Sequence, residues 1–219
     1  MTDMASIDSV TLEVADPTAA RRFLTTAFGP DPRIGLSTAE APATGFRGFT
    51  LSLVTSQPAD VRALSDAAVA AGAEVLKPAA KSLWGYGGVV RDPDGTIWQL
   101  VSSAKKDTGP ATGRVDEIVL LLGVADVAAS KRFYVGQGLT VAKSFGGKYA
   151  EFASGPDTVK LALYKRRGLA KLAGVAAEGT GSHRIAIGSA AGPFTDPDGF
   201  VWEAVSPAGV GGPQKTRQR

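Results

Sequence analysis

The chain has 219 residues, of which 44% are hydrophobic and 21% charged, and its formal net charge is +3. It has no cysteine and one histidine, His183, which excludes disulfides, thiolate catalysis and metal sites that need cysteine or several histidines. Three cations lie in the last five residues, so the rest of the chain is near neutral and gives no broad basic field for nucleic acid. No apolar run is long enough for a membrane span and no secretory signal pattern is visible, which favours a cytoplasmic protein.

The first half of the chain predicts a strand, a helix, a strand, a second helix and a run of strands. Apolar residues alternate over 10–14, and Asp16-Pro17 is a typical helix start that Gly29 would end. The later elements are expected as a strand at 49–54, a helix at 56–71, and strands at 74–77, 88–91 and 96–102. Asp92-Pro93-Asp94-Gly95 is the predicted turn between the last two strands.

An internal repeat divides the chain in two. The segment 92–99 recurs at 196–203, and Val-Ala-Asp at 14–16 recurs at 124–126 before a similar helix. The segment that begins at Arg47 resembles the one that begins at Arg184. These matches predict one domain at 1–104 and another at 113–208. Residues 105–112 are expected to form the polar linker, and 209–219 a disordered basic tail.

The repeated unit resembles a known family. The resemblance rests on Val124-Ala125-Asp126 through Phe133-Tyr134, on Ala71-Gly72-Ala73, on Trp84-Gly85 and on the two Asp-Pro-Asp-Gly turns. They resemble the glyoxalase/bleomycin-resistance/dioxygenase, or vicinal oxygen chelate, superfamily. The resemblance implies an α+β fold, in which paired βαβββ modules form cup-shaped mixed sheets, here duplicated in tandem. It does not fix a reaction, because members isomerise substrates, cleave rings, open epoxides or only bind drugs.

The two halves depart from the family pattern in complementary ways. The first module is shortened in domain one, and the second module lacks room for its helix in domain two. We therefore expect 46–103 and 113–165 to pair as one well-formed cup. The remaining segments, 6–37 and 182–206, would form a shallower one.

The family's metal-binding positions carry unsuitable residues here. The resemblance places Ser9, Arg47 (or Gly48) and Gln99 at these positions in domain one, and Glu117, Arg184 (beside His183) and Glu203 in domain two. Arginine repels a cation and serine is a weak ligand, so no tight transition metal and no other cofactor are expected. The alternative is a weak Mg or Mn site that uses Glu117 and Glu203. The simpler interpretation pairs Glu117 with Arg47 or Arg114, and Glu203 with Arg184.

Aromatic residues favour a ligand pocket. Trp84 and Tyr86 lie in a glycine-rich stretch that lines the cleft in the family, and Tyr164 is expected on a strand of domain two. Trp98 and Trp202 alternate with Gln99 and Glu203 and should face the helices. Lys165-Arg166-Arg167 with Lys171 is expected to be a solvated basic loop.

These observations leave three hypotheses. The first is a protein that binds a small organic molecule in the cleft, with Arg47, Trp84, Tyr86, Gln99, Tyr164, His183 and Arg184 as ligand-binding residues. The second is a divalent-metal-dependent, glyoxalase-like lyase or isomerase with Glu117 and Glu203 as catalytic residues, where His183 is a candidate base. In the third, side chains fill the clefts. A monomer or homodimer is expected, with no nucleic-acid or membrane partner.

Overall fold

The computed structural model describes residues 6–205. The predicted tail, 209–219, lies outside this range. The first half of the chain contains β1 (Ile7–Val14), α1 (Pro17–Phe28), β2 (Ile34–Thr38), β3 (Ala43–Gly45), β4 (Phe49–Val54), α2 (Pro58–Ala70), β5 (Glu74–Ser82), β6 (Gly85–Arg91) and β7 (Ile97–Ser102). The second half contains β8 (Glu117–Val124), α3 (Val127–Gly136), β9 (Val141–Phe145), β10 (Tyr149–Phe152), β11 (Val159–Lys165), α4 (Arg166–Ala173), β12 (Gly179–Gly181), β13 (Ile185–Ser189), β14 (Phe194–Thr195) and β15 (Val201–Ala204).

Local sequence signals set the ends of the repeated helices. The Asp16 side chain accepts hydrogen bonds from the amides of Thr18 and Ala19, and Asp126 does the same for α3. These carboxylates satisfy amides that have no partner within the first helical turn. The amide of Ala15 donates to Asp94, and the amide of Ala125 donates to Asp198. Each Asp-Pro-Asp-Gly turn therefore holds the start of the first helix of its own half.

Thirteen strands form one mixed sheet that contains two lobes. In the large lobe, β4 pairs antiparallel with β8. On the side of β4 the sheet continues with β7, β6 and β5, and on the side of β8 it continues with β11, β10 and β9. In the small lobe, β1 pairs antiparallel with β13, and β2, β15 and β14 complete the lobe. A single bridge between Ile7 and Val159 joins β1 to β11.

Each lobe is built from both halves of the chain, as the sequence predicted. The β4–β8 ladder joins 46–103 to 113–165, and the β1–β13 ladder joins 6–37 to 182–206. No helix separates β13 from β14 in the described chain, in agreement with the expected shortening of that module. The expected α+β fold of paired modules is confirmed, whereas the boundaries at 104 and 113 stay a prediction.

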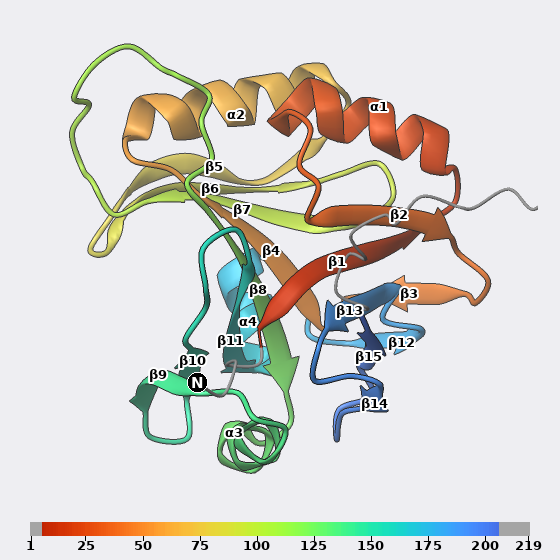
Figure 1. Ribbon diagram of the computed structural model, residues 1–219. Coiled ribbons are helices and arrows are strands. Elements are labelled where there is room, and N and C mark those ends of the chain that lie inside the picture. The colour runs from red at the N-terminus through yellow and green to blue at the C-terminus, as the bar shows by residue number, and fades with distance from the viewer. Residues whose placement is uncertain (1–5, 206–219) are drawn as a thin grey trace, which may run out of the picture.

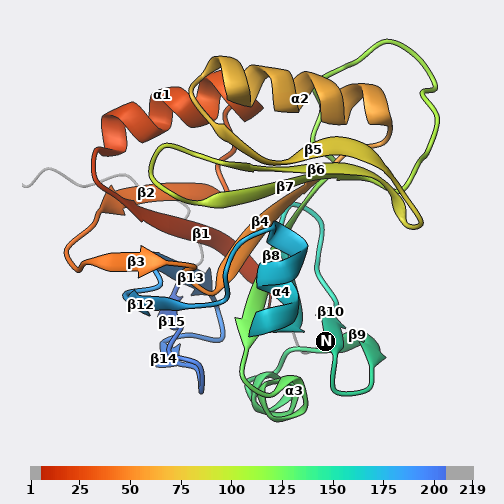
Figure 2. The same cartoon turned by 180° about the vertical axis from the view of Figure 1, so that it is seen from behind.

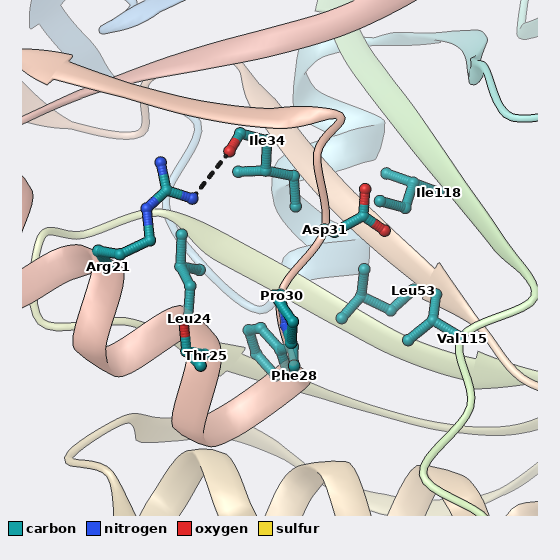
Figure 3. Close-up of a pocket in the computed structure, with 11 residues that line it drawn as sticks. Arg21, Leu24, Thr25, Phe28, Pro30, Asp31, Ile34, Leu53, Val115 and Ile118 are labelled. Carbon is teal, nitrogen blue, oxygen red and sulfur yellow. Dashed lines mark hydrogen bonds between the residues drawn. The ribbon is translucent and has the colours of Figure 1, made fainter.

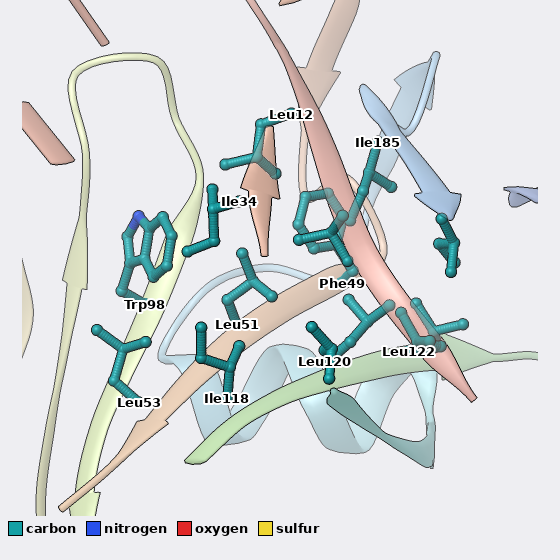
Figure 4. Close-up of a cluster of buried hydrophobic side chains, with 14 of the residues drawn as sticks. Leu12, Ile34, Phe49, Leu51, Leu53, Trp98, Ile118, Leu120, Leu122 and Ile185 are labelled. Carbon is teal, nitrogen blue, oxygen red and sulfur yellow. The ribbon is translucent and has the colours of Figure 1, made fainter. Parts of the chain in front are cut away.

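The main hydrophobic core lies between the sheet and helices α1, α2 and α3 (Figure 1). Figure 4 shows its centre, where Leu51 of β4 and Leu120 of β8 pack near Trp98 of β7. Trp98 and Trp202 are 0% and 1% exposed and belong to this core. They therefore face the helices, as alternation predicted. No helix of the described residues is long and apolar enough to cross a membrane.

Helix α4 lies on the opposite, inner face of the large lobe (Figure 2). Leu169, Ala170 and Ala173 are buried there in a second apolar cluster that also contains Val89 and Leu121 of the sheet. The expected loop at 165–167 and 171 is therefore wrong, because this segment includes a helix with an inward apolar face, whereas Lys165, Arg167 and Lys171 are solvent-exposed as expected. Gly174 ends α4 in the left-handed conformation, with a φ of 81°.

The connection between the two halves is held against α2. The side-chain oxygen of Gln57 accepts hydrogen bonds from the amides of Thr108 and Gly109, and its amide nitrogen donates to the carbonyl of Pro110. Oδ1 of Asp60 accepts from the amides of Thr112 and Gly113. Residues 105–112 contain no helix or strand, as expected of a linker, but these bonds fix their path.

Candidate functional site

The inner face of the large lobe carries buried polar residues beside α4. Gln99 of β7 is 6% exposed, and its Nε2 lies 2.8 Å from Oγ1 of Thr50 on β4. Ser52, the next inward residue of β4, pairs with Gln99 in the β4–β7 register. Because Gln99 donates to Thr50, its carbonyl oxygen is the group that can accept a hydrogen bond from a ligand.

A pocket of about 400 Å³ opens between this face, the β5–β6 hairpin and α4. Its wall includes the predicted residues Gln99, Trp84 and Tyr86, together with Val101 and Leu172. Lys77 and Lys81 add positive charge at its edge. The volume is in the range of pockets that hold a small organic ligand.

The two predicted aromatic residues of this pocket differ in orientation. Trp84 lies at the tip of the β5–β6 hairpin and is 85% exposed, so its ring is free to contact a ligand. The Tyr86 ring packs with the main core, and the guanidinium carbon of Arg62 on α2 lies 5.7 Å from the ring centroid. Alternation along β6 therefore turns the Tyr86 ring away from the inner face.

Glu117, predicted as catalytic, lies in a network of charged residues at the start of β8. Nζ of Lys160 is 2.7 Å from its Oε1 and 3.9 Å from Oε1 of Glu151. Glu117 is thus paired with Lys160 and not with Arg47 or Arg114. Burial raises the pKa of Glu151, but the hydroxyl of Tyr149 and the charges of Lys160 and Lys143 outweigh this effect and lower the pKa.

Arg47 and His183 occupy equivalent positions in the two lobes. Phe49 pairs with Leu122 and Ile185 pairs with Leu12, so the equivalent of Arg47 is His183. The expected correspondence between Arg47 and Arg184 is therefore wrong by one residue, and the alternative, Gly48, is correct. Gly48 and Arg184 are the true equivalents, with positive φ values of 87° and 54°.

The His183 ring joins the two lobes at this point. Its Nδ1 lies 2.5 Å from the carbonyl oxygen of Arg47, and its Nε2 lies 3.0 Å from that of Asp198. The ring also stacks on Phe200, with 3.9 Å between the centroids. Because both nitrogens face backbone carbonyls, the arrangement is typical of a structural histidine rather than a general base.

Arg47 and Glu203 lie apart from the pocket that Gln99 lines. Arg47 donates to the carbonyl of Asp94 and lines a separate cavity of about 40 Å³. Burial lowers the pKa of Arg47, and the nearby charge of Arg184 adds to this effect. Glu203 is exposed on β15 of the small lobe. Three strands separate β15 from β8 in the sheet, so roughly 20 Å lie between Glu203 and Glu117.

A further small cavity lies where α1 ends and β2 begins (Figure 3). It has about 20 Å³, which suffices for one water molecule. Arg21 crosses it to donate to the carbonyl of Ile34 at 3.1 Å. None of the predicted site residues lines this cavity, so it is not a candidate site.

Comparisons with known proteins show which family a segment of the chain resembles and which solved structures share its fold. Residues 29–100 match the family model Glyoxalase/Bleomycin resistance protein/Dioxygenase superfamily. This segment of the chain is therefore similar to the superfamily. Two crystal structures of glyoxalase I variants from Zea mays, each 16% identical, have TM-scores of 0.58 and 0.59. The first covers 91% of this chain and 92% of that chain, and the second 92% and 93%.

A further structure, glyoxalase I from Zea mays, is 15% identical with a TM-score of 0.55, over 84% of this chain and 74% of that chain. No curated protein sequence matches the chain. At these identities the structural likeness shows the fold alone.

The residues present do not fit the divalent metal that the family implies. Gln99 is bonded to Thr50, Glu117 is paired with Lys160, and Arg47 and Arg184 bring positive charge. Within residues 6–205, no group of three or more His, Asp or Glu side chains could hold a metal ion. We therefore derive no metal-dependent step for this chain.

Helix α4, which covers part of the inner face of the large lobe, was not predicted from the sequence. The available signal was Leu169, Ala170 and Ala173 at helical spacing, followed by Gly174. The preceding run of three cations concealed it, because such runs are typical of solvated segments.

Proposed function

We propose that this protein binds a small organic molecule in the pocket between the β5–β6 hairpin and α4, without a transition metal. The observation that carries the proposal is that the pocket brings together Trp84 and the buried amide of Gln99. Gln99 would accept a hydrogen bond from a ligand N–H or O–H group. Trp84, Val101 and Leu172 would cover the apolar part, and Lys77 and Lys81 favour a neutral or anionic ligand over a cation.

Glu117 and Glu203 have no part in this proposal. They lie in different lobes, and Glu117 is paired with Lys160. The lyase or isomerase alternative needs both carboxylates at one ion, and the geometry does not favour it.

Tryptophan fluorescence tests the proposal. Of the three tryptophans, Trp98 and Trp202 are buried, so a ligand-dependent change in emission reports on Trp84. We expect compounds selected from a panel by thermal shift to change this emission in the wild type but not in Trp84→Phe. Gln99→Leu should weaken binding about tenfold, because a lost hydrogen bond to a buried group is worth about 1.4 kcal/mol.

Glu203→Gln, in the other lobe, is the matched control and should bind like the wild type. Equal affinity of Gln99→Leu and wild type would refute the site. A stoichiometric transition metal found by elemental analysis would refute the proposal that binding needs no transition metal.

A further inference from the structure

We propose that a second groove, on the other side of α4, binds an organic anion that carries a flat apolar group. The groove has about 690 Å³ and lies between α4, the β9–β10 hairpin and β5. Its lining residues are Lys77, Lys148, Tyr149, Tyr164, Lys165, Arg167, Gly168, Lys171 and Leu172. It thus combines five cationic side chains with two tyrosine rings. It shares Lys77 and Leu172 with the pocket of the proposed function, but it does not rest on that function.

Among residues 6–205, the cations of the groove form no salt bridge with an acidic side chain. The salt bridges within the described chain involve none of Lys77, Lys148, Lys165, Arg167 and Lys171. Arg167 and Lys171 are four residues apart on α4, an arrangement of like charges that destabilises a helix by a few tenths of a kcal/mol. Because Lys148, Lys165, Arg167 and Lys171 form no salt bridge among the described residues, an anion is the partner that would balance their charge.

The apolar wall of the groove suits a flat ring. The Tyr149 and Tyr164 rings meet edge to face, with 4.9 Å between their centroids, and Phe145 stacks on Tyr149. Leu172 of α4 is partly exposed on the opposite side. An aromatic ligand between them would gain both burial and ring contacts.

The Tyr164 hydroxyl adds a donor. It makes no hydrogen bond to another side chain or backbone group among the described residues, whereas the Tyr149 hydroxyl donates to Glu151. Burial, and next the charge of Glu151, raise the pKa of Tyr164, so its hydroxyl keeps its proton at neutral pH. It can therefore donate to a carboxylate, sulfonate or phosphate oxygen.

The size and charge of the groove favour a small molecule over a polymer. Its volume is that of a single ligand site, and the chain outside its last five residues is near neutral. A nucleic-acid strand needs a basic surface that extends beyond one site.

Fluorescence titration with 8-anilinonaphthalene-1-sulfonate tests the proposal, since this probe joins a sulfonate to flat rings. We expect saturable binding that weakens as salt is added, and weaker binding of the uncharged N-phenyl-1-naphthylamine. The double variant Arg167→Glu/Lys171→Glu should lose about tenfold in affinity, since two exposed charge contacts at about 0.7 kcal/mol each correspond to that factor. Lys105→Glu/Lys106→Glu, in the linker, is the charge-matched control and should bind like the wild type.

Three results would overturn the proposal. The first is equal affinity of the groove double variant and the linker control. The second is loss of sulfonate binding in Gln99→Leu but not in the groove variant, which would place the probe in the other pocket. The third is tighter binding of a single-stranded oligonucleotide than of the sulfonate. If the Gln99 pocket binds no compound, the proposed function fails, but the results expected for the groove stay the same. The two proposals can therefore be refuted separately.

Discussion

Nζ of Lys77 lies 2.7 Å from the carbonyl oxygen of Leu172, and this bond ties β5 to the end of α4. The same ammonium group donates to the carbonyl of Lys171 at 2.7 Å. These carbonyls lie in the last turn of the helix, at the negative end of its dipole, and the Lys171 carbonyl also accepts from the amide of Gly174 at 3.3 Å. Lys77 therefore holds in place the helix that divides the inner face into two grooves.

Removal of this ammonium group should loosen α4. We expect Lys77→Met to lower the free energy of unfolding by about 1 kcal/mol, because two hydrogen bonds to helix carbonyls are lost. Hydrogen exchange of the α4 amides should accelerate. Lys81→Met removes an exposed lysine from the same strand and is the control; equal effects of the two variants would contradict the role of Lys77.

The carboxylate of Asp60 should make the stability of the protein depend on acid pH. Burial raises the pKa of Asp60, but hydrogen bonds from the Thr112 and Gly113 amides and the Thr112 hydroxyl outweigh burial and lower the pKa. The stabilisation is therefore present above the pKa of the unfolded chain, about 4, and is lost as the pH falls through the lower pKa of the folded protein.

The variant Asp60→Asn should be less stable than the wild type by about 1 kcal/mol at pH 7, since its neutral amide accepts weaker hydrogen bonds. Urea unfolding of both proteins at a series of pH values, about one pH unit apart from pH 3 to pH 7, measures this difference in stability. The difference should shrink below about pH 4. A difference that stays constant across this range would show that ionised Asp60 does not hold the linker.

Arg184 has a left-handed backbone where its equivalent in the other lobe is Gly48. A residue with a Cβ atom pays about 1–2 kcal/mol for this conformation. We therefore expect Arg184→Gly to be more stable than Arg184→Ala by about 1 kcal/mol, because both variants remove the guanidinium group but only glycine relieves the strain. Thermal unfolding of the two variants measures this difference in stability. An alanine variant as stable as the glycine variant would show that the backbone of Arg184 is not strained.

Local signals explain why much of the fold was predictable. The Asp16 cap and the two Asp-Pro-Asp-Gly turns depend on neighbours in sequence, and the structure has them where the sequence predicts. The equivalence of Arg47 and His183 depends on strand register across the whole chain, so the sequence could not decide between Arg47 and Gly48 as the equivalent of Arg184. The orientation of Tyr86 likewise depends on which face of β6 meets α2.

The predicted domains, 1–104 and 113–208, should not fold separately. Each segment holds only part of each lobe, because the β4–β8 and β1–β13 ladders cross between them. We expect a fragment of residues 1–106 and one of residues 107–219 to show little native circular dichroism alone and to regain it when mixed. The circular dichroism spectrum of the intact chain is the reference. A cooperative unfolding transition in either isolated fragment would refute this expectation.

The pairing of β1 with β13 has a consequence for synthesis of the protein on the ribosome. β1 leaves the exit tunnel long before β13, because most of the described chain lies between them. Until β13 has also emerged, one edge of β1 has no native partner, and the apolar residues that later meet β13 stay open to other contacts. Such distant pairing slows closure of the small lobe, so the large lobe is expected to form first during biosynthesis.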